Sequence, residues 1–562
     1  MLAFSGYVGV SFLFFGLRVV FQPRLSYVGT GVDPQIFIWS FAWWPHAILQ
    51  GVNPFVTHVV WAPSGLNLAW TTSVPGLALL FAPLTLLLGP VAAFNVAAVL
   101  MPAAAASTCF LLCRHLTRSI WPSLVGGYLF GFSSYMLGQQ EGHLQMTSVF
   151  LLPLVALTII RRLQETISRR RFQIQLGTLL ALQLSFSSEL FFTLTLAIAT
   201  AAVAAFVADP ALRSGLKSLV VPLLTSFLLA GLITSPFLYY AATGFDAHSI
   251  NAPRRFAADL LNLVVPTKLV LASANRTETI ASHFLGNDSE RGSYLGLPTL
   301  TMIALFAWRR GRTASGKLLI LCLTAATVAE LGASLRVDGR RLLPLPLSLI
   351  DHLSLFDNVL PARIAVYVSL LAALTVALWA AQTASRRLSI ALPALAVIAL
   401  LPRPGSHAWI TEPDNPRFIS ERVYQSCLKP GENTLIYPFG AKGNSMLWQA
   451  ESSFWFRLAG GYLSPTIPAP FRRFRAAHAS LHPSITAADI RQLARAKNVT
   501  AIIVDERHRT PWHALLPGTP TKIADILLYQ VAGPTSANAV VSHGKAPTRL
   551  GVTRSCPATS RS

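Results

Sequence analysis

Apolar stretches long enough to cross a bilayer recur along this chain, and short basic clusters separate them at every second junction. The clusters are Arg114/Arg118, Arg161/Arg162/Arg169/Arg170/Arg171, Arg213/Lys217, Arg309/Arg310/Arg312/Lys317 and Arg386/Arg387. Loops rich in Lys and Arg stay in the cytoplasm, so this pattern predicts which connections lie on each side of the membrane. The other connections hold most of the unusual polar residues, and function is expected there.

The composition is that of a membrane protein. Of the 562 residues, 53% are hydrophobic and only 12% are charged, which is far more apolar than a typical soluble protein. The net charge of +22 does not require a nucleic acid, because a basic cytoplasmic face attracted to anionic lipid explains most of it. We therefore expect a multi-pass protein of the plasma (inner) membrane, with membrane lipids and no nucleic acid among its partners.

A membrane-spanning helix needs roughly 20 apolar residues, and about eleven segments are candidates for such spans. They run approximately over residues 2–21, 91–113, 120–137, 146–160, 174–188, 190–207, 219–241, 294–308, 318–335, 364–381 and 388–401. An odd number of spans places the N-terminus in the cytoplasm and the C-terminal region outside. Residues 74–88 are ambiguous, but a short segment with two prolines and no basic flank fits an interfacial or re-entrant piece better than a span.

The predicted fold class is an all-α polytopic membrane domain followed by a small extracytoplasmic α/β domain. The expected divisions are 1–403 for the membrane domain, 22–90 for its first external loop, 404–531 for the α/β domain and 532–562 for a flexible tail. In the second domain, Thr434–Tyr437 and Thr500–Val504 predict buried strands, and Thr486–Ala496 predicts a helix with Asp489 in a capping box. Cys427 and Cys556 pair only if they lie close together, which the sequence leaves open.

Tryptophan is concentrated in the first external loop, at Trp39, Trp43, Trp44, Trp61 and Trp70. Indole rings favour the headgroup layer of a bilayer. Residues 34–50 are therefore expected to form a helix lying along the outer membrane surface.

Asp33 is the strongest candidate for a catalytic group. It stands in Gly29-Thr30-Gly31-Val32-Asp33-Pro34, which predicts a tight turn at the membrane surface directly after the first span. A carboxylate partly withdrawn from water there can serve as a general base. The same residue is also a good helix N-cap followed by proline, so capping and catalysis both remain open.

The layout of the chain resembles the GT-C superfamily of integral-membrane glycosyltransferases. The matching features are Asp33 soon after the first span, the long first loop, about eleven spans and the C-terminal domain. First-loop stretches that also resemble bacterial members are Gly51-Val52-Asn53-Pro54-Phe55, Pro63-Ser64-Gly65-Leu66-Asn67-Leu68-Ala69-Trp70 and Ser73-Val74-Pro75-Gly76.

The resemblance implies transfer of a sugar from a polyprenyl-phosphate donor to an extracytoplasmic glycan, lipid or protein acceptor, with inversion. Asp33 would deprotonate the acceptor hydroxyl while the lipid phosphate leaves. No Asp-x-Asp or Asp-Glu pair stands beside Asp33, so no motif supports a divalent metal and no cofactor is assigned.

Cations for the leaving phosphate must come from external loops. The candidates are Arg254, Arg255, Lys268 and Arg276 in one such loop and Arg340, Arg341 and Arg363 in another. Arginine can grip a phosphate through two parallel hydrogen bonds, which favours Arg254 and Arg363. Each of these two could instead be a residue that snorkels to the interface.

Residues 140–145 form an unusually polar link between two spans. Glu141, His143 and Gln145 would supply donors and acceptors to sugar hydroxyls, and Trp44 is a further candidate for sugar or acceptor binding. The alternative for the link is an ordinary solvated turn, since short loops are generally polar.

Other polar residues give weaker indications of function. Glu189 lies between two apolar runs, where an acid must either face a cavity or occupy an external turn. His46, His58 and His248 are too scattered in sequence to predict a metal site.

Two other function classes compete with the enzyme. A transporter or flippase of a lipid-linked glycan would share the basic loops and the span number, but it should place polar groups near the membrane midplane. A non-catalytic assembly subunit would use its C-terminal domain to bind an envelope partner. The concentration of polar residues in external loops favours a membrane glycosyltransferase.

Overall fold

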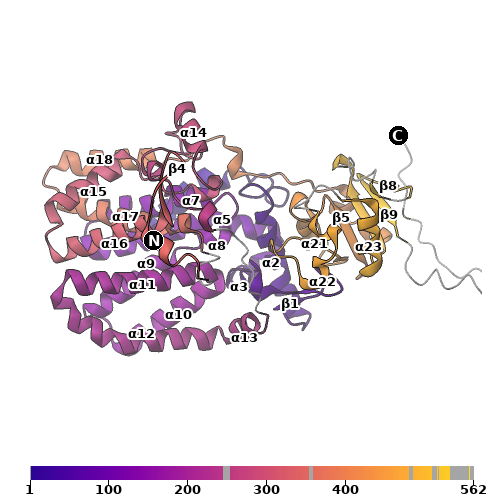
Figure 1. The fold of residues 1–562 in the computed structure, drawn as a ribbon, viewed down its shortest axis with the longest axis horizontal. Coiled ribbons are helices and arrows are strands. Elements are labelled where there is room, and N and C mark those ends of the chain that lie inside the picture. Colours follow the sequence, from indigo (N-terminus) through magenta and orange to yellow (C-terminus); the bar gives the residue numbers. More distant parts are fainter. Residues whose placement is uncertain are drawn as a thin grey trace, which may run out of the picture.

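The computed structural model shows a helical body joined to a smaller part built around a β-sheet (Figure 1). The structure describes residues 2–244, 253–353, 359–479, 485–508, 515–516, 518–531 and 556. The two parts lie at opposite ends of an elongated molecule, and helix α2 (Asp33–Leu49) lies between them.

Each of the eleven segments expected to span the membrane contains a helix. These helices are α1 (Leu2–Ser11), α5 (Pro90–Thr117), α6 (Ile120–Gly131), α9 (Leu151–Leu163), α10 (Arg169–Phe186), α11 (Ser188–Ala208), α12 (Arg213–Ile233), α15 (Leu297–Arg310), α16 (Ala314–Glu330), α17 (Ala365–Gln382) and α18 (Arg386–Ala399). Within the described part of the chain, five helical stretches are long and apolar enough to cross a bilayer: Pro90–Thr117, Leu144–Leu163, Ser188–Ala208, Pro210–Ile233 and Pro361–Gln382. These helices support a multi-pass membrane protein, whereas the count of eleven crossings stays a prediction.

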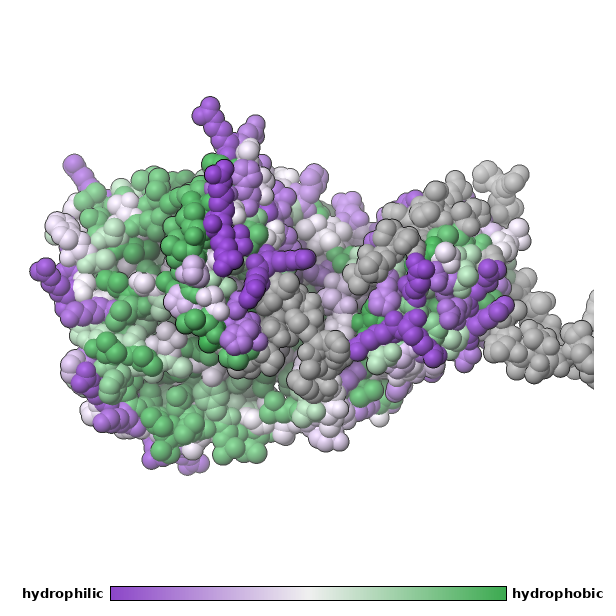
Figure 2. Space-filling model, in the orientation of Figure 1, coloured by the Kyte–Doolittle hydropathy of each residue, from purple (hydrophilic) through white to green (hydrophobic). Residues whose placement is uncertain are grey.

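The helices differ in how much apolar surface they leave uncovered. The stretches that contain α5 and α17 are 67% and 72% buried, so these two helices form the centre of the body. The stretches that contain α11 and α12 are only 28% and 22% buried. Figure 2 shows the resulting hydrophobic surface over the helical body. Apolar surface of this extent indicates contact with lipid rather than water.

The ambiguous segment 74–88 forms two short helices. These are α3 (Pro75–Leu80) and α4 (Ala82–Leu88), which meet at Phe81. Neither has the length of a membrane-spanning helix. The other short elements of the helical body are α7 (Ser134–Gln139), α8 (Leu144–Thr147), α13 (Ser235–Thr243), α14 (Asn275–Ser282) and the hairpins β1 (Val56–Thr57)/β2 (Leu66–Asn67) and β3 (Ser334–Val337)/β4 (Arg340–Pro344).

Helix α2 corrects the expectation for the first loop. The helix is present, but most of its side chains are buried in protein instead of facing lipid headgroups. It packs on α3 and α5 on one side and on α21 (Ser445–Glu451) of the C-terminal part on the other. The indole of Trp39 stacks on Trp43 and donates a 2.8 Å hydrogen bond to Gln449. The tryptophans at 39, 43, 44 and 61 are therefore core residues that join the two parts, not headgroup anchors.

The C-terminal part holds a mixed five-stranded sheet in the order β6-β5-β7-β9-β8. Its elements are β5 (Asn433–Tyr437), β6 (Arg457–Leu458), β7 (Ala501–Asp505), β8 (Thr521–Ile523), β9 (Ile526–Gln530), α19 (Arg417–Ser420), α20 (Tyr424–Cys427), α21, α22 (Ala469–Arg472) and α23 (Ala487–Ala496). Strands β5 and β7 and helix α23 lie where the sequence predicts them. Thr486 and Asp489 form the predicted capping box. The boundaries 1–403 and 404–531 themselves stay a prediction.

Cys427 and Cys556 form a disulfide, with their Cα atoms 5.0 Å apart. The sequence left this pairing open. Apart from Cys556, the predicted tail of residues 532–562 lies outside the described residues.

Candidate active site

Asp33 begins α2 directly after a turn that packs against the link between α7 and α8. Gly29 has φ +100°, and a Cβ there would lie 2.6 Å from the backbone oxygen of Glu141, so the turn requires glycine. The Thr30 N–H donates to the same oxygen at 2.5 Å. The N-cap position of α2 is Val32 and no side chain caps the helix. The capping alternative for Asp33 is therefore wrong, and its side chain, 37% exposed, is directed elsewhere.

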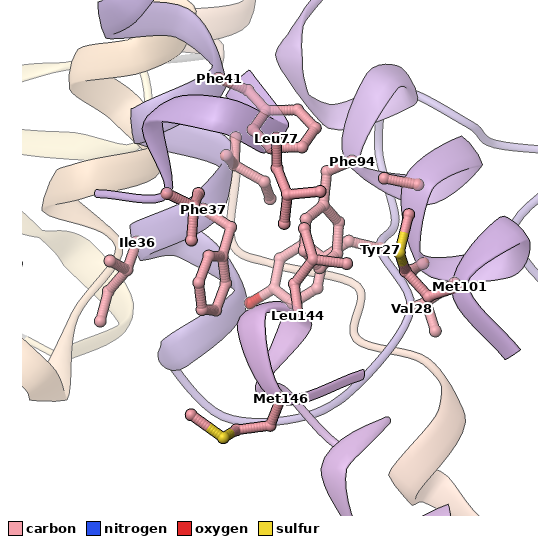
Figure 3. Packing of buried hydrophobic residues seen from close by; sticks show 14 of the residues in the cluster. Tyr27, Val28, Ile36, Phe37, Phe41, Leu77, Phe94, Met101, Leu144 and Met146 are labelled. Atoms are coloured by element: carbon pink, nitrogen blue, oxygen red, sulfur yellow. The ribbon is translucent and has the colours of Figure 1, made fainter. Parts of the chain in front are cut away.

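Aromatic packing fixes the turn and the start of α2 against α5 (Figure 3). Phe37 stacks on Phe94 with ring centroids 6.4 Å apart, and Tyr27 meets the same ring edge-on. Asn95 of α5 accepts a hydrogen bond from the Val28 N–H at 3.0 Å. Asp33 therefore extends from a rigid element, as a catalytic group requires.

His143 is the partner of Asp33. Its Nε2 lies 3.2 Å from Asp33 Oδ2, and its Nδ1 lies 2.9 Å from Gln139 Oε1. The amide of Gln139 cannot be turned around, because its Nε2 donates at 2.7 Å to the Ser289 carbonyl, which only accepts. Nδ1 of His143 must then carry a proton toward Gln139. Nε2 of His143 then faces Oδ2 of Asp33, and these are the two atoms between which a proton can be shared.

Glu141, two residues before His143, is 7% exposed and close enough to feel the charge of His143. Ser289 Oγ donates to its carboxyl at 3.0 Å. Burial raises the pKa of Glu141 to about 7, although this hydrogen bond and the charges of Lys268 and His143 act in the opposite direction. The alternative of an ordinary solvated turn is wrong for this link, because Gln139 and Gln140 are also buried.

Lys268 is the predicted phosphate-binding cation that lies close to Glu141. Its ammonium forms a 2.6 Å ion pair with Asp288, and half of its side chain remains exposed. The hydrogen bond to Asp288 raises the pKa of Lys268, with a smaller contribution from the charge of Glu141. The ammonium is therefore charged between Asp288 and the neighbouring Glu141.

Arg363 occupies a buried cluster of three charges. Its Nε and Nη2 donate to Glu290 at 2.9 and 2.6 Å, and its Nη1 donates to Glu189 at 2.5 Å. Burial raises the pKa of Glu290, but the charge and hydrogen bonds of Arg363 outweigh it, so that the pKa is lowered. Glu189 thus takes part in a buried cluster instead of lying free in an external turn. Through Glu290 and Ser289, the cluster adjoins Gln139 and the Asp33–His143 pair.

An apolar cavity of about 920 Å³ opens between α9, α11, α12, α16 and α17. Its charged lining residues are Arg254, Arg336, Arg341 and Asp351. Arg254 and Asp351 form a 2.8 Å ion pair, which leaves the excess charge on Arg336 and Arg341. These two arginines are directly opposite each other in the β3/β4 hairpin. Like charges in this register repel, so the pair favours an anion bound between or beside them.

The remaining predicted residues do not join the Asp33 cluster. Arg255 and Arg340 are exposed, and Arg340 is opposite Val337 and does not line the cavity. Trp44 is 2% exposed and donates to the Ser73 carbonyl, so it presents no free face to a sugar. Gln145 is buried, and no hydrogen-bond partner of its Oε1 stands among the described residues.

Gln139, Ser289, Glu290 and Arg336 were not among the candidates of the sequence prediction, whereas Arg341 was a candidate cation. Spacing in the sequence gives no signal for Ser289, because it reaches the site from a loop 148 residues after Glu141. Arg336 and Arg341 flank Asp338-Gly339, a turn signal that predicts a hairpin and hence their opposition. Within the described residues, no group of three or more His, Cys, Asp or Glu side chains is placed to hold a metal ion. His248 lies outside the described residues.

The family described as a domain of unknown function (DUF6311) matches residues 6–401. No curated protein matches the sequence. Similar solved structures include the oligosaccharyltransferase AglB of Archaeoglobus fulgidus with an inhibitory peptide and a dolichol-phosphate, at 11% identity and a TM-score of 0.51, covering 91% of this chain and 70% of that one.

The apo form of the Archaeoglobus fulgidus oligosaccharyltransferase is 12% identical, with a TM-score of 0.52 and the same coverage of 91% and 70%. A mutant of the arabinofuranosyltransferase AftD from Mycobacteria is 13% identical, with a TM-score of 0.50, over 90% of this chain and 36% of that one. The fold is that of the GT-C glycosyltransferases, which confirms the resemblance seen in the sequence.

Proposed function

We propose a reaction for this chain from the premise that it belongs to the family described as a domain of unknown function (DUF6311) and has the GT-C fold. The chain transfers a sugar from a polyprenyl-phosphate donor to an extracytoplasmic glycan, lipid or protein. The observation that carries this proposal is the Asp33–His143 pair, held on a rigid turn and partly open to solvent.

The Asp33–His143 pair acts as the base. The acceptor oxygen forms a bond to the anomeric carbon while the bond from that carbon to the phosphate oxygen breaks with inversion. The acceptor proton goes to the pair, where Oδ2 and Nε2 share it, and the electron pair of the broken bond leaves on the lipid phosphate. Gln139 is a positioning residue, because it fixes which nitrogen of His143 faces Asp33.

The apolar cavity is proposed to hold the lipid of the donor. Its walls are aliphatic, and Arg336 and Arg341 stand among them. An amphipathic anion with a long apolar tail satisfies both features, since the phosphate relieves the repulsion between the arginines. The exposed Arg254 pairs with Asp351 and can exchange this partner for phosphate. Arg363 is held by two carboxylates, so we propose that it orients the site rather than grips phosphate.

The cavity wall connects to the proposed base through neighbouring residues. Pro361 and Ile364 line the cavity on either side of Arg363 in the sequence. Arg363 binds Glu290, whose neighbour Ser289 accepts from Gln139, and Gln139 binds His143. These groups lie at the ends of helices and in loops, a placement that favours chemistry at the membrane surface over a carrier with a midplane site.

The test uses the full chain, purified in lipid nanodiscs, with a panel of polyprenyl-phosphate sugars. Release of polyprenyl phosphate that depends on an added acceptor is the expected result. Arg341→Gln should weaken binding of undecaprenyl phosphate, whereas Arg276→Gln, an exposed residue of α14 that does not line the cavity, should not. Transport of a lipid-linked glycan across vesicles with no transfer from any donor would contradict the proposal.

A further inference from the structure

A second cavity, of about 320 Å³, lies between the turn that precedes α2 and the C-terminal part. One wall is formed by Tyr27, Thr30, Gly31, Val32 and Gln35. The facing wall includes Glu412, Asp414, Lys442, Asn444 and Trp448. Val32 and Gln35 stand on either side of Asp33 in the sequence, so the cavity lies against the start of the helix that carries the proposed base.

The two walls are tied together by short polar contacts. Gln35 Nε2 donates to Asn444 Oδ1 at 2.5 Å, and Thr411 Oγ1 donates to the Gly29 carbonyl at 2.8 Å. The cavity is therefore a fixed feature of the junction and not a loose gap between two parts. Its volume falls in the lower range of small-molecule sites.

The lining is polar and offers unused charge. Among the residues that the structure describes, neither Glu412 nor Lys442 has an ion-pair partner, and both are exposed. Gly31 has φ +76° and nothing within 4 Å of the position of a Cβ, so its backbone is open to an occupant. The Glu412 carboxylate and the Lys442 ammonium thus share one small space with the amides of Gln35 and Asn444 and with Asp414 and Asp505, whose carboxylates pair with Arg507.

We propose that this cavity is the acceptor subsite and takes a sugar ring bearing neighbouring hydroxyl groups, an inference that rests on the proposed function. Hydroxyls donate and accept at once, so adjacent ones match a carboxylate and amides set around a small space. A peptide would be expected to add a strand to a free sheet edge or to fill apolar pockets. Strand β5, which ends at the cavity, already pairs with both β6 and β7.

The closeness of Asp33 to the C-terminal part supports this assignment. Tyr462 lies close enough for the Asp33 charge to raise its pKa, which burial has already raised, to about 12. Tyr462 belongs to Gly460-Gly461-Tyr462, and Gly461 packs against Val60 and Met446. The proposed base and the cavity therefore both lie where the turn before α2 meets the C-terminal part.

The experiment measures glycan binding by the full chain in nanodiscs, on an array of immobilised neutral saccharides and peptides. Wild type should retain saccharides, and Glu412→Gln and Lys442→Gln should each weaken retention about tenfold, as expected for loss of a charged hydrogen bond. Glu421→Gln, an exposed carboxyl of the same region outside the cavity, is the matched control and should behave as wild type.

Binding of undecaprenyl phosphate is measured on the same preparations, and it separates this inference from the proposed function. Retention of no saccharide, equal retention by the cavity variants, or selective retention of peptides would each overturn the acceptor assignment while lipid binding stands. Failure of the wild-type protein to bind undecaprenyl phosphate would instead count against the proposed function.

Discussion

Glu141→Gln is expected to remove a pH-dependent loss of stability from the protein. Burial raises the pKa of Glu141 from 4.5 to about 7. Between these values the folded state holds a proton that the unfolded state has lost, so stability falls as pH rises through this window. Glutamine keeps an acceptor for the Ser289 hydroxyl but does not ionise.

The size of the effect follows from the shift. Each pKa unit corresponds to 1.36 kcal/mol, so the ionised carboxylate costs about 3 kcal/mol at high pH. About 2 kcal/mol of this cost is expected to develop between roughly pH 5.5 and pH 8. Glu451, whose pKa burial also raises to about 7, adds a slope of its own. The pH-dependent loss of stability in wild type should therefore be the sum of the two contributions, and each single variant should lack one of them.

The assay is thermal unfolding of the full chain in detergent, followed at both pH values. The Glu141→Gln variant should lose less stability than wild type when the pH is raised. Adding Glu451→Gln should flatten the pH dependence of stability further. Glu421→Gln, an exposed carboxyl, is the control and should leave the dependence unchanged. Equal pH dependence in wild type and Glu141→Gln would refute the assignment of a buried carboxyl at this position.

Three further changes have defined outcomes. Arg363→Met should destabilise the protein by about 3–5 kcal/mol in thermal unfolding, because two carboxylates lose their buried partner; replacing both acids by glutamine in the same chain should recover much of the loss. Arg336→Gln and Arg341→Gln should each weaken binding of undecaprenyl phosphate, with a smaller dependence on salt than wild type; equal affinity would count against an anion at this pair. Cys427→Ser should abolish the difference in gel mobility between reduced and oxidised protein and lower the unfolding temperature, because the bond closes a loop with a sequence separation of 129 residues.

Patterns of local sequence predicted the helical body well. Apolar length and the positions of basic clusters located every helix that was expected to span the membrane, because these signals depend only on the bilayer. The capping box at Thr486 and strands β5 and β7 were likewise local signals. The surroundings of α2 could not be predicted from local sequence, because a tryptophan-rich helix suits either a headgroup layer or a protein interface. Its partners Gln449 and Phe454 lie far along the chain.

For the candidate site, too, the sequence predicted individual residues but not how they are arranged. Asp33, Glu141 and His143 were found because each is polar where a membrane protein is otherwise apolar. Their arrangement needed the fold, which brings the link between α7 and α8 against the turn before α2. Arg363 was recognised as important but not as one member of a charge cluster, since its partners Glu189 and Glu290 stand 174 and 73 residues away.

The proposed mechanism depends most on Asp33 acting as the base. The measurement is the single-turnover rate of acceptor-dependent polyprenyl phosphate release, compared between wild type and Asp33→Asn, with undecaprenyl phosphate binding measured on both. Asparagine keeps the shape of the side chain but cannot take the proton, so the rate should fall by about 100-fold or more while lipid binding stays unchanged. Equal rates in the two proteins would show that the proton leaves by another route and would contradict the mechanism.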